Sequence, residues 1–211
     1  DAKQIKISVV EELTKSGLLA LNENAQTAYD IVCADFNSEE NELCREIRKN
    51  NYPNTISNRI LVSVAQTLTD AKLSVSSRTN ASNNYSIILI NTENYTVGCI
   101  VDQNDHWKKS KYMKELSQYN AYLNPKNGDL FAEPTDTLKT KSFIYARIVI
   151  LNEQVHVHFH IPYQDDIKKD YIKFSLTNAL EAFDDETLTR KPQAKKVKLK
   201  KPLFNQNRKI S

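Results

Sequence analysis

Three histidines alternate with apolar residues in the last third of the chain, in a pattern that can bind a metal ion. His156, His158 and His160 occupy every second position of an otherwise apolar stretch. If this stretch is a β-strand, all three imidazoles lie on one face, with neighbours about 7 Å apart. Two histidines on one strand can ligate a single zinc or iron ion when a third ligand lies nearby.

The third ligand would come from the end of another strand, where Asp102, Asp105 and His106 have suitable side chains. The predicted metal ligands are His156, His158 and Asp102, and a divalent-metal-dependent hydrolase or nuclease is the function that such a site supports. The alternative is that the histidines line the more polar face of a half-buried strand and bind no metal. A restriction-type nuclease site is not expected, because residues 143–151 contain no acidic residue.

A second group of residues combines positive charge with aromatic rings. Aromatic faces stack on unpaired nucleobases while lysines contact the phosphates, so this group is the best nucleic-acid surface in the body of the chain. The alternative is that the rings anchor a helix on a sheet and the lysines are only solvated. The group consists of Trp107, Lys108, Lys109, Lys111, Tyr112 and Lys114.

The C-terminal residues 190–211 form a basic tail with nine lysines and arginines and no acidic residue. Subtracting these nine from the 29 bases of the chain leaves 20 bases against 26 acidic residues, so the body carries about −6. The tail has few apolar residues and self-repelling charges, and we expect it to be flexible. Its stretch from Lys195 to Lys198 resembles short nuclear localisation signals. The tail lysines expected to bind a partner are Lys195, Lys196, Lys198, Lys200 and Lys201.

The composition excludes several classes of protein. With only three glycines, none near another, the chain lacks the phosphate-binding loops of P-loop and dinucleotide-binding proteins and the nucleophile elbow of hydrolases. The three cysteines form no C-x-x-C pair and lie in apolar stretches, which favours a reducing compartment. We expect a cytoplasmic protein, or a nuclear one in a eukaryote. No apolar run reaches the roughly 20 residues of a membrane span.

Helical spacing dominates the first third of the chain. It predicts one helix in residues 3–20 that ends near Gly17, a second capped by Thr27, and a third over residues 38–49. A break containing Pro53 separates the third helix from a fourth over residues 55–70. The last two helices and the strands that follow have the order of a winged-helix module, although this stretch has no excess of basic residues for phosphate binding.

The remaining sequence predicts strands over residues 72–78, 85–91, 95–102, 143–151 and 155–162. Hairpin turns join the second strand to the third at residues 91–94 and the fourth to the fifth at residues 152–154. A helical stretch over residues 107–119 is inserted before the fourth strand, and an amphipathic helix covers residues 167–183.

The predicted fold class is α+β, with N-terminal helices packed on a mostly antiparallel sheet of about five strands and a C-terminal amphipathic helix. We predict a single domain over residues 1–189, made of a helical layer (residues 1–70) and a sheet-containing part (residues 71–189), followed by the basic tail.

The predicted function is non-catalytic binding of nucleic acid or an acidic protein surface, through the tail and the lysine-rich aromatic helix, without a membrane. No cofactor is predicted apart from the divalent metal of the histidine site. Two alternatives remain open, the metal-dependent enzyme and a protein-interaction or inhibitor module that uses the acidic body.

Overall fold

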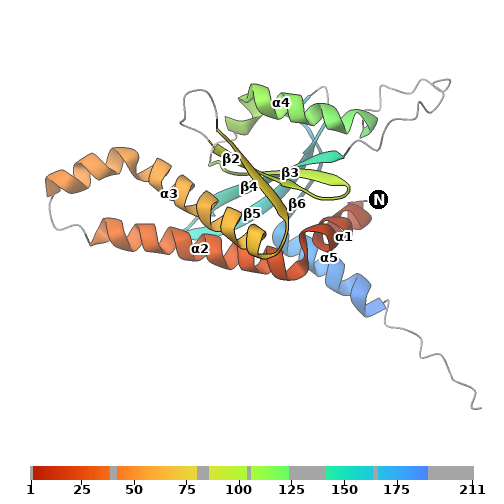
Figure 1. Cartoon of the computed structure of the whole chain (residues 1–211), viewed down its shortest axis with the longest axis horizontal. Coiled ribbons are helices and arrows are strands. Elements are labelled where there is room, and N and C mark those ends of the chain that lie inside the picture. Colours follow the sequence, from red (N-terminus) through yellow and green to blue (C-terminus); the bar gives the residue numbers. More distant parts are fainter. Residues whose placement is uncertain are drawn as a thin grey trace, which may run out of the picture.

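In the computed structural model the chain forms a six-stranded sheet with helices on both faces (Figure 1). The structure describes residues 2–38, 42–79, 86–103, 106–123, 141–163 and 166–189. The α-helices in these ranges are α1 (Ala2–Leu13), α2 (Lys15–Asn37), α3 (Glu42–Asp70), α4 (Lys111–Ser117) and α5 (Leu176–Thr189). Two 3-10 helices, η1 (His106–Lys109) and η2 (Gln118–Leu123), flank α4.

The strands lie side by side in the order in which they occur in the chain. They are β1 (Ser74–Thr79), β2 (Ser86–Asn91), β3 (Tyr95–Val101), β4 (Ser142–Leu151), β5 (Gln154–Pro162) and β6 (Asp170–Ser175). All neighbours pair antiparallel except β3 and β4, which are parallel. A parallel pair needs a long crossover, and the stretch that contains η1, α4 and η2 lies in this connection.

The two faces of the sheet are covered unequally. Helices α1, α2, α3 and α5 cover one face and α4 covers the other (Figure 1). The larger apolar cluster lies on the first face and includes Val9, Val64, Ile90, Val157 and Phe174. The smaller cluster lies under α4 and includes Ile100, Met113, Leu116, Phe143 and Tyr145. Helix α4 spans seven residues, and we call its side of the sheet the α4 face.

The predicted α+β class is confirmed, including the N-terminal helices and the mostly antiparallel sheet. The helix predicted over residues 167–183 was wrong in its first half, because residues 170–175 form β6 and α5 begins at Leu176. Ile172 and Phe174 alternate with polar residues, yet Ile172 also has helical spacing to Leu176, so the two periods overlap here. Ser175 ends the strand and caps α5, since its hydroxyl accepts the Asn178 N–H at 3.1 Å.

The helix boundaries predicted at Gly17 and Thr27 were wrong. Gly17 lies in the first turn of α2, where its N–H donates to the Thr14 hydroxyl at 3.0 Å. A Cβ at position 17 would come within 2.8 Å of that oxygen, so glycine accommodates a helix start here and not a helix end. Thr27 lies inside α2 and its hydroxyl donates back to the Glu23 carbonyl at 2.9 Å.

The break predicted at residues 50–54 was also wrong, because α3 continues through Pro53. Proline has no N–H, so one backbone hydrogen bond of the helix is lost, and packing against α2 compensates for this loss. Tyr52, next to the proline, packs on Phe36 of α2 with 4.3 Å between ring centroids and 33° between ring planes. The two separate helices that a winged-helix module requires are therefore one helix, and that interpretation is withdrawn.

Both predicted hairpins are present. Asn152 and Glu153 join β4 to β5 with φ of 49° and 64°, the left-handed conformation of a two-residue type I′ turn. The connection between β2 and β3 is held by Glu12 of α1, whose carboxylate accepts the Asn94 N–H at 3.0 Å and the Thr92 hydroxyl. This contact fixes the end of α1 on the sheet.

Candidate functional site

The lysine-rich aromatic segment forms η1 and α4 on the α4 face. The Ser110 hydroxyl caps α4 by accepting the Met113 N–H at 3.4 Å. Met113 and Leu116 are buried against the sheet, so the helix cannot rotate freely. The opposite side of the segment carries three exposed lysines, which are Lys109, Lys111 and Lys114, whereas Lys108 is half-buried.

An aromatic ring and an arginine from another element extend this basic surface. Tyr112 is half-buried, and the guanidinium of Arg78 on β1 lies 4.0 Å from its ring centroid, in cation–π contact. Tyr119 of η2 is 44% exposed. The backbone of Trp107 is part of η1, but its side chain lies outside the described part of the structure. We call Arg78, Lys109, Lys111, Tyr112 and Lys114 the α4 surface.

The position of α4 depends on a buried asparagine in η2. The Asn120 side chain accepts the Phe143 N–H at 2.8 Å and donates to the carbonyls of Phe143 and Pro162 at 3.0 and 2.9 Å. Pro162 has no N–H to offer to β4, and the Asn120 amide takes over this role. The end of α4 is thereby attached to the β4–β5 pair.

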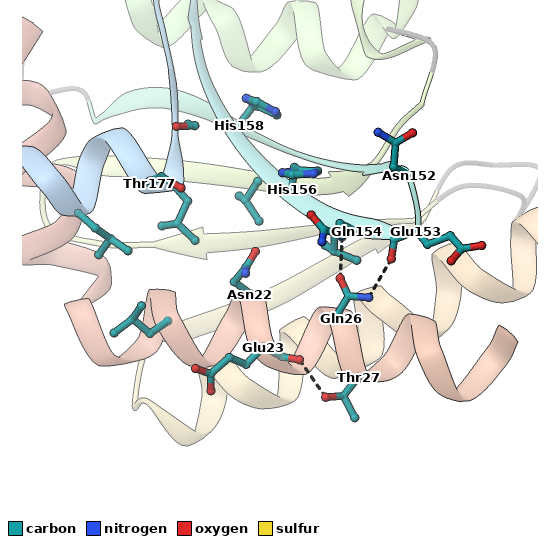
Figure 2. A pocket seen from close by; sticks show the side chains of 16 residues that line it. Asn22, Glu23, Gln26, Thr27, Asn152, Glu153, Gln154, His156, His158 and Thr177 are labelled. Carbon is teal, nitrogen blue, oxygen red and sulfur yellow. Dashed lines mark hydrogen bonds between the residues drawn. The ribbon is translucent and has the colours of Figure 1, made fainter. Parts of the chain in front are cut away.

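The histidine strand has the predicted alternation. Val155, Val157 and Phe159 are buried in the larger cluster, while His156 and His158 are half-buried on the other side of β5. Figure 2 shows both imidazoles on the side of β5 that faces away from α2.

The third histidine, His160, is 1% exposed, and its Nδ1 lies 2.9 Å from an Asp170 oxygen. Asp170 was missed in the sequence because the strand that holds it, β6, was read as helix.

Positive charge surrounds His158. Its pKa is lowered from the ordinary value of 6.5, first by burial and then by the charges of Lys173, His160, His156 and Arg147. Arg147 pairs with His158 across β4 and β5, and Lys173 pairs with His160 across β5 and β6. The charged neighbours that lower the pKa of His158 are all bases, and burial is the larger cause of the shift.

The predicted metal ligands do not form a group that could hold a metal ion. Among the residues that the structure describes, no cluster of three or more histidine, cysteine, aspartate or glutamate side chains has suitable geometry. Asp102 follows β3, is 4% exposed, and its carbonyl oxygen accepts the Arg147 Nε at 2.7 Å. Strand β4 separates β3 from the histidines of β5, which places Asp102 about 10 Å from His156. Asp105 lies outside the described residues.

A pocket of about 900 Å³ borders the histidines where β6 ends and the outer edge of β5 is left open (Figure 2). It is lined by α2, the β4–β5 turn, β5 and the start of α5. Gln26 of α2 protects this edge, since its side chain accepts the Val155 N–H at 2.7 Å and donates to the Glu153 carbonyl at 3.0 Å. The polar lining includes Asn22, His156 and His158.

Comparison with models of known protein families, with curated protein sequences and with solved structures found no match. None of the helices in the described ranges is long and apolar enough to cross a membrane. The tail lysines Lys195 to Lys201 lie outside the described residues, so their role remains a prediction from sequence.

Three bases of the α4 face were not predicted from sequence as parts of a site. Arg78, Arg147 and Lys173 are far apart in the chain and lie on this face only through the register of β1, β4 and β6. The alternation of Tyr171, Lys173 and Ser175 with apolar residues was the available signal.

Proposed function

We propose that this chain is a non-catalytic nucleic-acid-binding protein that uses the α4 surface together with the basic C-terminal tail. The observation that carries the proposal is the arrangement of α4, with Met113 and Leu116 buried and Lys111 and Lys114 exposed on the opposite side. A helix held in this way presents its lysines in a fixed arrangement, so little conformational freedom is lost on contact with phosphates.

The distribution of charge supports the same face. Helix α5, on the other side of the sheet, contains four acidic residues and no lysine or arginine. The segment over η1 and α4 contains four lysines and one glutamate. A polyanion is therefore attracted to the α4 segment more than to α5, where Lys15 and Lys3 already pair with Asp184 and Glu186.

The aromatic residues favour unpaired bases over a duplex. Tyr119 is exposed, and Tyr112 is half-buried with the Arg78 guanidinium over its ring. Stacking on such rings needs a base that has left its pair, which single strands provide. The tail enters the proposal through its sequence, as a group of charges that adds phosphate contacts.

The test measures binding of the full chain to a labelled single strand of about 20 nucleotides over a range of salt concentrations. The variant Lys109→Gln/Lys111→Gln/Lys114→Gln removes three phosphate contacts, each worth about 0.7 in the slope of log affinity against log salt. We expect the slope to fall by about 2 and the affinity at about 0.1 M salt to fall roughly 100-fold.

The matched control removes three exposed bases from α3, on the other side of the sheet, with Arg45→Gln/Arg48→Gln/Lys49→Gln. The control should keep the slope of the unmodified chain. Equal losses in both variants, or equally strong competition by polyglutamate, would overturn nucleic acid as the ligand of the α4 surface and favour an acidic protein partner.

A further inference from the structure

The sheet ends at β1, a strand that lacks the usual protection of a sheet edge. In the part of the chain that the structure describes, β1 pairs with β2 alone, so one row of its backbone N–H and C=O groups faces away from the sheet. Five of its six residues are exposed, and Val75 is half-buried. Its ladder with β2 runs from Ser74 to Thr79 without a register shift, so no bulge bends this edge away from another strand.

The other edges of the sheet are protected. Strand β6 carries Asp170 and Lys173, and its ladder with β5 contains a register shift. The part of β5 beyond the end of β6 is bonded to the Gln26 side chain. Strand β1 contains no proline, lysine or acidic residue, and its one base, Arg78, lies over the Tyr112 ring on the α4 face. Strand β1 is therefore the edge that can accept another strand.

Helix α3 borders this edge and leaves a groove beside it. A pocket of about 430 Å³ lies between α3 and the β1–β2 pair, with Val62 on its helix side and Ser77 and Ile88 on its strand side. Val62 is 65% exposed, the largest fraction of any exposed large apolar side chain in the described ranges. Ser77 pairs with Ile88, so a small side chain leaves room beside an apolar one. A strand added to β1 would place alternate side chains in this groove.

The side of α3 that lines the groove is uncharged, in a chain of which 26% of the residues are charged. The charged residues between positions 58 and 70 are Arg59 and Asp70, and both line a different pocket, between α2 and α3. Depletion of charge is typical of the centre of a protein–protein interface, whereas a phosphate-binding surface requires bases. The neutral residues of α3 at the groove are Asn58, Leu61, Val62, Ala65, Gln66 and Thr69.

A second copy of this chain matches both parts of this surface. Strand β1 is about 20 Å long and residues 58–69 of α3 extend over about 18 Å, so the strand and the helix offer contacts of similar length. Two β1 strands can pair antiparallel about a two-fold axis perpendicular to the sheet, which also brings the two α3 helices side by side on one face. Pairing centred on Ser76 or Ser77 sets Arg78 opposite a serine of the second copy, so like charges do not meet.

We propose that the chain forms a symmetric dimer through β1 and the neutral side of α3, in which two six-stranded sheets join into one. Val62 packs against α3 of the second copy, while Val75, Ser77 and Thr79 of both copies fill the groove beneath the helices. The two α4 surfaces then lie on the same side of the joined sheet. The dimer rests on the edge strand and the groove, and does not depend on the proposed function.

The first test is sedimentation velocity of the full chain over a range of micromolar concentrations, which should show twice the mass of one chain. The variant Val62→Glu/Ser77→Glu brings two carboxylates per copy to the axis, and both sites are exposed, so it should fold. Because like charges then face each other, the dissociation constant of the dimer should rise at least about tenfold. The matched control is Leu151→Glu/Thr177→Glu, with one exposed apolar and one exposed hydroxyl site on β4 and α5, and it should dimerise like the unmodified chain.

Cysteine crosslinking of the full chain locates the contact. In Ser76→Cys or Ser77→Cys, made separately, the residue at the axis lies about 5 Å from its copy between Cα atoms, within reach of a disulfide. Diamide as oxidant should give a covalent dimer with one of these variants and no more with Leu151→Cys than with the unmodified chain.

Three results would each overturn the proposal: a monomer at every concentration, a dimer that Val62→Glu/Ser77→Glu leaves intact, or crosslinking no faster than in Leu151→Cys. A monomer would leave an extended segment of another protein as the occupant of the groove. A monomer that binds single-stranded nucleic acid would overturn the dimer and support the proposed function, whereas a dimer that binds none would do the reverse.

Discussion

The replacement Asn120→Ala tests how the α4 face is held together. The Asn120 side chain makes three hydrogen bonds inside the protein: it accepts one from the Phe143 N–H and donates two, to the carbonyls of Phe143 and Pro162. Each contributes about 1 kcal/mol net, and the backbone groups left behind stay buried, which adds to the cost. We therefore expect the free energy of unfolding to fall by about 3 to 4 kcal/mol, with a melting temperature lower by roughly 10 °C.

The assay is urea unfolding of the full chain followed by circular dichroism. The control is Gln118→Ala, two residues earlier, where the side chain is exposed and donates to the Lys114 carbonyl at a long distance of 3.4 Å; the loss should stay below about 0.5 kcal/mol. Asn120→Asp should be at least as harmful as alanine at neutral pH, because it sets a carboxylate against two carbonyl oxygens. A loss below about 1 kcal/mol for Asn120→Ala would refute the reasoning that this amide replaces the missing N–H of Pro162.

Three further predictions concern stability. Glu12→Gln replaces one carboxylate oxygen that accepts hydrogen bonds from the β2–β3 turn, so thermal unfolding should show a free energy of unfolding lower by about 1 to 2 kcal/mol. An unchanged melting temperature would contradict the contribution of Glu12 to holding α1 on this turn. At Gly98 even a Cβ would lie 2.9 Å from Ile87 and 3.2 Å from the Phe143 ring, so the side chain of Gly98→Val does not fit. Urea unfolding of this variant should show a free energy of unfolding lower by about 1 to 3 kcal/mol, and an unchanged value would contradict the close packing of this face. The pKa of His158 is lowered in the folded chain, so the unfolded chain binds a proton at a higher pH than the folded chain does, and the free energy of unfolding should fall as the pH drops from about 7 to 5. In His158→Gln the part of this pH dependence that is due to His158 should disappear. An identical pH profile in both chains would count against the buried, positively charged surroundings of this histidine.

The sequence supported the fold class because the strong periodicities agreed with the final structure. The apolar run at 143–151 and the alternation at 155–162 predicted β4 and β5, and residues 152–154 predicted the turn between them. The errors arose where two signals competed. Pro53 has the chemistry of a helix breaker, and only the long-range contact between Tyr52 and Phe36 shows why the helix continues.

The candidate site was predictable only where it is local in sequence. The spacing of Met113 and Leu116 among the lysines predicted that one side of α4 is buried and the other side carries the exposed lysines. The position of Arg147 and Lys173 on the α4 face was not predictable, because it depends on the strand register, and the register of β6 cannot be derived from a sequence whose spacing favours a helix there. The same missing strand concealed the pairing of His160 with Asp170.

The measurement that tests the central claim most directly is the salt dependence of single-strand binding by the full, unmodified chain. Three lysines of the α4 surface and about five tail lysines, each contributing about 0.7, predict a slope of roughly −5 to −6 for log affinity against log salt. Neutralising the five lysines Lys195, Lys196, Lys198, Lys200 and Lys201 should leave a slope of about −2 from the α4 surface. No binding at about 50 mM salt, or a slope near zero, would contradict the account.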